Sequence, residues 1–244
     1  MALGWTQTRS VLARVAALAA GAVLLSGCQS IQGTSPSSPE VRFVAASPDA
    51  PGLDFYLNSS ALVYNLGYNS QTNYIPVNAG NYTVNADKYS TNQVLATAGL
   101  GVRTGNHYTV IAGNIQASLQ LQALTDQTGP SASGQVNFRL IDQSVSSGAI
   151  DVYLVPSGGK LTTTNPIATN LTFSSLTGYI PVPAGTYQVA IVPAGTVPIS
   201  TTITSFTGAS TVYNTGAAVT LLVDDKQLVT TPTLNVVTLN DYPN

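Results

Sequence analysis

The chain has 244 residues, enough for one large all-β domain or for two of ordinary size. Charged residues make up only 7% of it, against roughly 25% in ordinary soluble domains, while the hydrophobic share of 44% is normal. With a net charge of -2, the surface has little long-range field, which excludes recognition of nucleic acid through phosphate neutralisation.

Residues 1–28 have the pattern of an export signal. Arg9 and Arg14 precede an apolar run over residues 15–25, which is shorter than the roughly 20 residues that a membrane span needs. The run ends in Leu25, Ser26, Gly27 and Cys28, which resembles the bacterial lipobox, where the cysteine thiol receives a diacylglycerol. We expect cleavage before Cys28 and a lipid anchor on it; the alternative is a conventional secretory signal with an accidental cysteine.

This reading places the protein in the cell envelope, exported and anchored to the membrane through lipid. Gln29 stands where an aspartate would favour retention in the inner membrane of enterobacteria, so the outer membrane is favoured where the host has one. Residues 29–40 are rich in Ser and Pro without periodicity, which predicts a flexible tether. Trp5 lies in the signal, and no second cysteine exists for a disulfide, so core packing must stabilise the mature chain.

Residues 41–126 predict a first β-sandwich domain. Alternating apolar segments between turn residues predict strands over 41–44, 53–57, 61–66, 93–98, 107–112 and 118–124, with a turn at Gly99-Leu-Gly101. Residues 73–84 predict a hairpin in which Gly80 takes a positive φ, Pro76 marks an edge strand, and Tyr82 and Val84 share one face. No segment has a convincing helical period.

Residues 127–134 predict a linker, and residues 135–244 predict a second domain that repeats the first in the same order. Residues 136–140 match 41–44, residues 150–154 match 53–57, and residues 178–189 repeat the hairpin, with Pro181 and Gly185 in place of Pro76 and Gly80. Strands over 201–206 and 219–223 follow, and then a turn at Asp224-Asp225-Lys226. The expected fold is all-β, with two tandem antiparallel β-sandwich domains of immunoglobulin-like or transthyretin-like type; a continuous barrel is the alternative.

Two motifs carry a family resemblance. Ser47-Pro-Asp-Ala-Pro followed by Leu53-Asp-Phe-Tyr, and Tyr-Ile-Pro-Val-x-Ala-Gly-x-Tyr-x-Val at residues 74–84 and 179–189, resemble the bacterial secreted family called domain of unknown function 4397. Its members are often lipoproteins with tandem copies, and the resemblance covers most of residues 41–241. The second unit departs from it, because residues 142–148 replace the Ser-Pro-Asp-Ala-Pro turn. The family has no established activity, so it implies architecture and location only.

Few residues point to catalysis or to a metal. His107 is the only histidine, no Gly-x-Ser-x-Gly motif exists, and the second repeat has Ala218 at the matching position. Asp54 and Asp151 occupy matching strand positions, which predicts solvated or edge-protecting carboxylates; calcium binding with Asp49 is the alternative, but no calcium-loop sequence is present. We therefore expect no enzyme, no metal site and no cofactor.

Tyrosine side chains are the remaining candidates for contacts. Tyr64, Tyr68 and Tyr89 lie in or beside predicted loops and could meet a protein or a glycan. The sequence favours a non-enzymatic surface lipoprotein of the cell envelope, acting as a structural or adhesion-type protein-binding module. The alternatives are a cell-wall or polysaccharide-binding module, weakened by the lack of tryptophan in the mature chain, and, less favoured, a hydrolase using His107. Expected partners are the membrane and a protein or glycan, but no nucleic acid.

Overall fold

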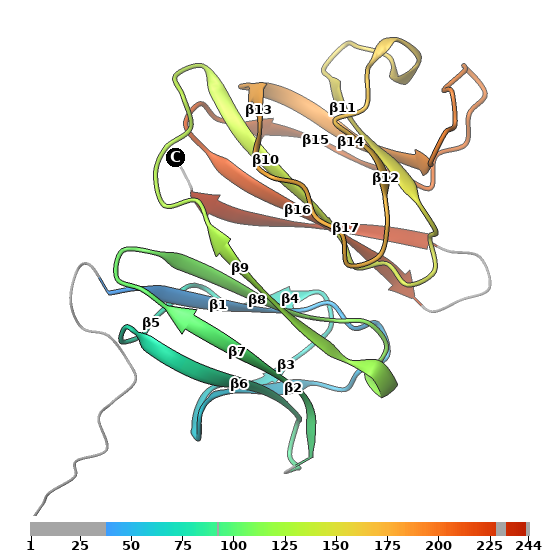
Figure 1. Cartoon of the computed structure of the whole chain (residues 1–244). Coiled ribbons are helices and arrows are strands. Elements are labelled where there is room, and N and C mark those ends of the chain that lie inside the picture. The colour runs from blue at the N-terminus through green and yellow to red at the C-terminus, as the bar shows by residue number, and fades with distance from the viewer. Residues whose placement is uncertain (1–37, 92, 228–232, 243–244) are drawn as a thin grey trace, which may run out of the picture. The chain divides into compact units, whose positions relative to one another are not determined.

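The computed structural model describes residues 38–91, 93–227 and 233–242, all within one compact unit (Figure 1). These residues form seventeen β-strands and two short 3-10 helices, η1 (Gln116–Ser118) and η2 (Leu161–Thr163), and contain no α-helix. The residues of the expected signal, lipobox and tether up to residue 37 lie outside the described part, including Leu25, Ser26, Gly27 and Cys28.

Strands β1 to β9 form two sheets. The first inner sheet has the order β4-β1-β8-β9, with β5 also paired to β1. The first outer sheet has the order β3-β2-β6-β7. In chain order the strands are β1 (Glu40–Ala45), β2 (Leu53–Leu57), β3 (Ser60–Leu66), β4 (Ser70–Gln71), β5 (Ile75–Pro76), β6 (Gly80–Lys88), β7 (Val94–Val102), β8 (His107–Gly113) and β9 (Gln120–Asp126).

Strands β10 to β17 repeat this arrangement. The second inner sheet has the order β13-β10-β16-β17 and the second outer sheet the order β12-β11-β14-β15. The strands are β10 (Gln135–Asp142), β11 (Ile150–Pro156), β12 (Ala168–Leu171), β13 (Ile180–Pro183), β14 (Gly185–Pro193), β15 (Phe206–Tyr213), β16 (Ala218–Gln227) and β17 (Thr233–Tyr242). The all-β sandwich prediction is confirmed. The described residues form one compact unit, so the limits of two separate domains stay a prediction.

Each inner sheet contains one parallel strand pair, so the expectation of purely antiparallel sandwiches is wrong in this respect. β1 runs parallel to β8, and β10 runs parallel to β16. Parallel strands are typically buried on both faces. Accordingly, Val41 and Phe43 of β1 enter the core of the first sandwich, while Arg42 and Val44 point to the opposite face and are also buried.

The repeated Tyr-Ile-Pro-Val motif is a crossing between sheets and not a hairpin. β5 pairs with β1 in the inner sheet, whereas β6 pairs with β2 and β7 in the outer sheet; β13 and β14 are separated in the same way. A turn between alternating segments is common to both arrangements, so the pattern could not distinguish them. The edge position of Pro76 and Pro181 is confirmed, because β5 and β13 each pair on one side only.

The glycine of this motif has an ordinary backbone conformation. Neither Gly80 nor Gly185 has a positive φ, contrary to expectation. A Cβ on these residues would lie 3.6 Å from the ring of Tyr82 and 3.5 Å from that of Tyr187, which is ordinary van der Waals contact, so the tyrosine packs over the backbone without requiring glycine there. Each tyrosine hydroxyl then donates a 2.8 Å hydrogen bond to the carbonyl oxygen four residues earlier, which fixes the corner.

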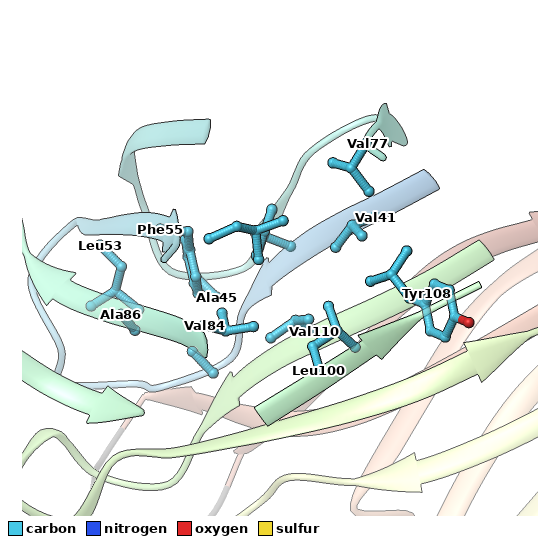
Figure 2. Packing of buried hydrophobic residues seen from close by; sticks show 14 of the residues in the cluster. Val41, Ala45, Leu53, Phe55, Val77, Val84, Ala86, Leu100, Tyr108 and Val110 are labelled. Atoms are coloured by element: carbon cyan, nitrogen blue, oxygen red, sulfur yellow. The ribbon is translucent and has the colours of Figure 1, made fainter. Parts of the chain in front are cut away.

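Each sandwich has its own apolar core. Figure 2 shows the first one, where side chains of the outer sheet, such as Leu53 and Phe55, and side chains of the inner sheet, such as Ala45 and Val110, belong to one cluster. The core of the second sandwich is built from the corresponding strands. The predicted inward alternation in β6 and β14 is confirmed, because Val84, Val189 and Ile191 are buried in these cores and Tyr82 and Tyr187 pack against them.

Three local predictions are wrong. The Gly99-Leu-Gly101 segment lies inside β7, and β15 begins only at Phe206, the last residue of the segment predicted as a strand. Asp224, Asp225 and Lys226 lie inside β16, and both aspartates are fully buried. Two consecutive aspartates normally indicate a solvent-exposed segment or a turn. This end of β16 is instead covered by other parts of the chain.

Asp54 and Asp151 are buried, so their reading as solvated carboxylates is also wrong. Asp54 accepts a 2.7 Å hydrogen bond from the backbone N–H of Asn65, and Asp151 accepts bonds of 2.8 and 2.9 Å from the N–H groups of Asn170 and Gly195. Asn65 and Asn170 both have a positive φ, and register shifts occur in the same strand pairs. The repeated aspartate therefore stabilises an irregularity beside each outer sheet.

Candidate functional site

The two inner sheets pack face to face through a small apolar cluster. It consists of side chains from both halves of the chain: Val44, Ala46, Ile111, Leu124, Ile141, Leu222 and Leu239. These residues alternate along their strands with those that enter the sandwich cores. The burial of both faces of each inner sheet therefore joins the sandwiches into one body.

Beside this cluster, Arg42 links the first inner sheet to the second. Its Nε donates to Thr109 Oγ1 at 2.7 Å, Nη1 donates to the carbonyl oxygen of Asn240 at 3.0 Å, and Nη2 donates to the carboxylate of Asp241. The guanidinium also lies over the ring of Tyr74, 4.7 Å from its centroid. Arg42 and Asp241 are both buried, so this ion pair is shielded from water.

Arg139 makes the equivalent contacts from the second inner sheet to the first. Its Nε donates to Thr220 at 2.8 Å, Nη1 donates to the carbonyl oxygen of Thr125 at 3.0 Å, and Nη2 donates to Asp126 at 2.5 Å. Its guanidinium lies 4.8 Å from the ring centroid of Tyr179. The two networks are related by pseudo-two-fold symmetry, and each half supplies the arginine to the other half's carboxylate.

The symmetry also orders the remaining donors. Tyr74 and Thr109 donate to Asp126 at 2.7 and 2.5 Å, while Tyr179 and Thr220 both donate to Asp241 at 2.6 Å. Burial together with the nearby carboxylates raises the pKa of both tyrosines, so they remain protonated donors. Two arginines face two aspartates, and the formal charge of the network is zero.

The network was not predicted from the sequence. The predicted match of residues 136–140 to residues 41–44 is wrong by two positions. The structure places Arg139 opposite Thr220 as Arg42 lies opposite Thr109, so the true counterpart of Arg42 is Arg139 and not Asn137. A signal was present, because each half has one arginine inside an apolar strand and an aspartate at the end of its last strand. The predicted match of His107 with Ala218 agrees with these registers.

A cavity of about 550 Å³ opens beside the Arg42 side of the network. Its volume is in the range of small-ligand sites. It is lined by residues of both sandwiches, including Glu40, Asn73, Tyr74, His107, Asn240 and Tyr242. Asp241 neutralises the charge of Arg42, so the lining carries no uncompensated positive charge. It offers amides, hydroxyls and the carboxylate of Glu40.

His107 lies in this pocket at the start of β8. Its Nε2 is 3.4 Å from Glu40 Oε2, and its ring centroid is 4.9 Å from that of Tyr74. Nδ1 is buried and has no hydrogen-bond partner among the described residues. No serine or cysteine of the described chain lines the pocket, and the hydroxyl of Thr72 accepts the backbone N–H of Phe43. Among the described residues, the pocket therefore places no serine hydroxyl or cysteine thiol beside this imidazole.

The tyrosines proposed from sequence lie elsewhere. Tyr64 on β3 is 66% exposed, and Tyr89, directly after β6, is 46% exposed. Tyr68 is half-buried with its hydroxyl fully buried, and burial beside Asp224 and Asp225 raises its pKa. None of the three lines the pocket. Contact roles for Tyr64 and Tyr89 stay predictions, and the Tyr68 hydroxyl is not offered to solvent.

A second polar cluster contains Asp142, Asp224 and Asp225, which are all fully buried. Asp225 accepts hydrogen bonds from the backbone N–H of Val145 and from two serine hydroxyls. Asp224 lies near Tyr68 and Asn235 without a hydrogen bond of ordinary geometry. Burial, with the neighbouring carboxylates, raises the pKa of Asp224 to about 8, and burial raises that of Asp142 to about 7.

Within the described residues, no three His, Cys, Asp or Glu side chains are arranged to hold a metal ion. The same part of the chain contains no helix with the length and apolar character of a membrane span.

Comparison with protein families gives one match. Residues 39–153 match the family model described as Domain of unknown function (DUF4397). The DUF4397 match covers β1 to β10 and most of β11. It includes Arg42, His107, Asp126 and Arg139 of the interface. No curated protein matches the chain.

Several solved structures are distantly similar. The Bacillus anthracis TIE protein is 14% identical with a TM-score of 0.25, and the match covers 78% of this chain and 34% of that one, so the chain spans about a third of its length. An alpha-glucan-binding streptococcal virulence factor is 10% identical with a TM-score of 0.24, covering 63% and 80%. CBMbc of Eubacterium rectale Amy13K, in complex with maltoheptaose, is 9% identical with a TM-score of 0.24, covering 85% and 98%. At these TM-scores the likeness carries no argument about function.

Proposed function

We propose that the protein is a non-enzymatic binding module of the cell envelope, held at the membrane by lipid on Cys28, which contacts a protein partner in a structural or adhesion-type role. The observation that carries this proposal is the pocket beside β1 and β8. It combines a concave volume with amide and hydroxyl groups, and its arginine is already neutralised within the fold.

The surroundings of Tyr74 favour protein over polysaccharide. Sugar rings bind by stacking on open aromatic faces, but Tyr74 has the guanidinium of Arg42 over its ring and the imidazole of His107 beside it. Tyr74 therefore acts as a support for other side chains. The remaining amides and carboxylate suit the hydrogen-bonding groups of a peptide.

Site-specific crosslinking on intact cells tests this function. A photoreactive amino acid at Asn73, which lines the pocket, is expected to capture a defined protein, whereas the same group at the exposed Tyr89 serves as the matched control outside the pocket. Recovery of polysaccharide alone at Asn73, or hydrolytic activity abolished by His107→Ala, would contradict the proposal.

The anchor is tested separately. Metabolic labelling with a fatty-acid probe is expected to mark the wild-type chain but not the Cys28→Ala variant, and this variant should leave the membrane fraction. A Cys28→Ala chain that stayed with the membrane would rule out the lipid anchor without bearing on the pocket.

A further inference from the structure

The outer faces of the two outer sheets differ in what covers them. On the second outer sheet, the side chains that point away from the sandwich core form an apolar cluster, and Leu161 of η2 packs against it. The members of this cluster are Tyr153, Val155, Ala190 and Val192, and all are buried. The cover comes from the long connection between β11 and β12, residues 157–167. In the first half, β2 and β3 are joined by Asn58 and Ser59 alone, so no equivalent segment connects these strands.

The strand registers identify the equivalent residues on the first outer sheet. They are Tyr56 for Tyr153, Asn85 for Ala190, Asp54 for Asp151 and Asp87 for Val192. The tyrosine is kept, but an amide and a carboxylate replace the two apolar side chains of β14. Tyr56, Asn85 and Asp87 are all partly exposed, so this face is open where its counterpart is buried.

A second tyrosine completes the open face. Tyr64 of β3 lies opposite Asp54 and is 66% exposed, whereas the second half has Thr169 at the matching position. Burial, and after it the nearby Asp54, Tyr64 and Asp87, raise the pKa of the Tyr56 hydroxyl, so these groups share one neighbourhood. Tyr64 and Asp87 are therefore present in the half whose face is open and replaced in the half whose face is covered.

The two carboxylates of this face have no cation beside them. Asp54 and Asp87 lie directly opposite each other on neighbouring strands, where like charges destabilise a sheet. Asp54 accepts the N–H of Asn65, but Asp87 Oδ1 is buried without a hydrogen-bond partner among the described residues. Neither aspartate belongs to an ion pair of the described chain. Lys88 follows along β6 and so lies on the opposite face, with Ala86.

Elsewhere in the fold, arginine satisfies this combination of groups. Arg42 lies over the ring of Tyr74, 4.7 Å from its centroid, and donates to Asp241, and Arg139 is bound in the equivalent way. A guanidinium can do both at once because it is planar, with donors along its edge. The open face offers tyrosine rings and carboxylates together, and the described chain places no arginine on it.

We propose that the outer face of the first outer sheet binds an arginine side chain of a partner protein, which stacks on the tyrosine rings of Tyr56 and Tyr64 and pairs with Asp87. The carboxylates require a cation, and the rings favour the planar cation over the ammonium of lysine. None of these residues lines the pocket, so the inference goes beyond the proposed function and does not rest on it.

The test uses three blocked peptides, Gly-Ser-Xaa-Ser-Gly, where Xaa is arginine, citrulline or glutamate. Citrulline has nearly the shape of arginine but no charge. Titration of the arginine peptide into the full chain should shift the NMR signals of the Tyr56 and Tyr64 rings, and the glutamate peptide should not. The arginine peptide should bind about fivefold more tightly than the citrulline peptide, as for one exposed ion pair.

Two variants locate the binding. Asp87→Asn should abolish the preference for arginine without lowering the urea midpoint, because it also removes the repulsion from Asp54. A merely structural role of Asp87 would instead lower that midpoint and leave the preference unchanged. Glu40→Gln is the matched control, since it removes a partly exposed carboxylate from the pocket and should leave all three affinities unchanged.

Equal affinity for the arginine and citrulline peptides, or tyrosine signals that no peptide shifts, would overturn the inference. A preference that survives Asp87→Asn, or is lost in Glu40→Gln, would do the same by placing the binding elsewhere. Shifts caused by maltoheptaose but not by the arginine peptide would assign the face to a glycan and also refute it. If Asp87→Asn does not fold, the comparison of peptides on the wild-type chain decides alone. The crosslink at Asn73 reports on the pocket, so the failure of either proposal is distinguishable from the failure of the other.

Discussion

Replacing Arg42 with methionine removes one cation from the buried network that joins the sandwiches. The wild-type guanidinium is buried and makes hydrogen bonds to Thr109, Asn240 and Asp241. Removing one partner of a buried ion pair typically costs about 3–5 kcal/mol, because the remaining charge stays buried. Asp241 keeps donors from two hydroxyls and has Arg139 at 3.5 Å, so we expect a loss near the lower end, about 3 kcal/mol in the free energy of unfolding.

Because the network is pseudo-symmetric, Arg139→Met can be compared directly with Arg42→Met. In Arg139→Met, Asp126 keeps its own two hydroxyl donors and has Arg42 at 3.9 Å, so the cost should agree with that of Arg42→Met within about 1 kcal/mol. The double variant Arg42→Met/Asp241→Leu removes both members of one pair. It should cost less than the sum of the two single changes by about 0.5–3 kcal/mol, the usual coupling of contacting groups.

Urea unfolding followed by far-ultraviolet circular dichroism measures these differences. Arg103→Met is the control, since Arg103 is exposed, and should change stability by less than about 0.5 kcal/mol. A loss below about 1 kcal/mol for Arg42→Met, or additive single and double changes, would refute the buried network as described.

Three further changes probe the rest of the fold. Burial raises the pKa of Asp224 to about 8, so its contribution to stability is complete below its ordinary pKa and is lost as the pH rises to about 8. Urea unfolding at pH 5 to 9 should show a decline in the free energy of unfolding, of which Asp224→Asn removes on the order of 3 kcal/mol; the remainder belongs to Asp142, whose pKa burial raises to about 7, and an unchanged decline in Asp224→Asn would refute this assignment. Asp225→Asn replaces one of the two oxygens that accept three hydrogen bonds and should destabilise at every pH. Gly113→Ala places a Cβ 1.9 Å from Gln143 Oε1 and should cost about 1–2 kcal/mol in urea unfolding, with Gln143→Ala restoring most of it; an undiminished loss in the double variant would rule out this contact as the cause. Asp151→Ala should lower the thermal midpoint more than Asp54→Ala does, because two backbone N–H groups lose their acceptor instead of one at about 1–3 kcal/mol each, and equal shifts would contradict this count.

The sequence allowed the repeat, the all-β class and most strands to be predicted, because alternation in segments such as residues 53–57 depends only on which side chains are apolar. It could not show which strand pairs with which. The Tyr-Ile-Pro-Val motif has the same alternation whether β5 and β6 pair or belong to different sheets. Long-range partners decide that question, and no local signal reports them.

The site was less predictable for a related reason. Arg42 lies between apolar neighbours on its strand and Asp224 directly follows an apolar run, and a charged residue at such a position normally faces solvent. Here a second sandwich covers that face, so both are buried. Burial by another part of the chain cannot be read from the period of one strand. Only the paired recurrence of arginine and aspartate in the two halves could have indicated it.

The buried network has a geometric consequence beyond its own stability. A buried ion pair often stabilises a protein little more than apolar residues of similar size would. The directions of its hydrogen bonds therefore matter more here than the stability it adds. Arg42 bonds the carbonyl oxygen of Asn240 and the carboxylate of Asp241, and thereby holds the end of β17 against β1. The same segment supplies Asn240 and Tyr242 to the pocket, which also contains Glu40 and His107 of the first sandwich. The pocket therefore exists only while the two sandwiches are joined. Arg42→Met should consequently reduce the protein crosslink at Asn73 even where the protein remains folded, whereas Arg139→Met, which does not line the pocket, should leave it intact.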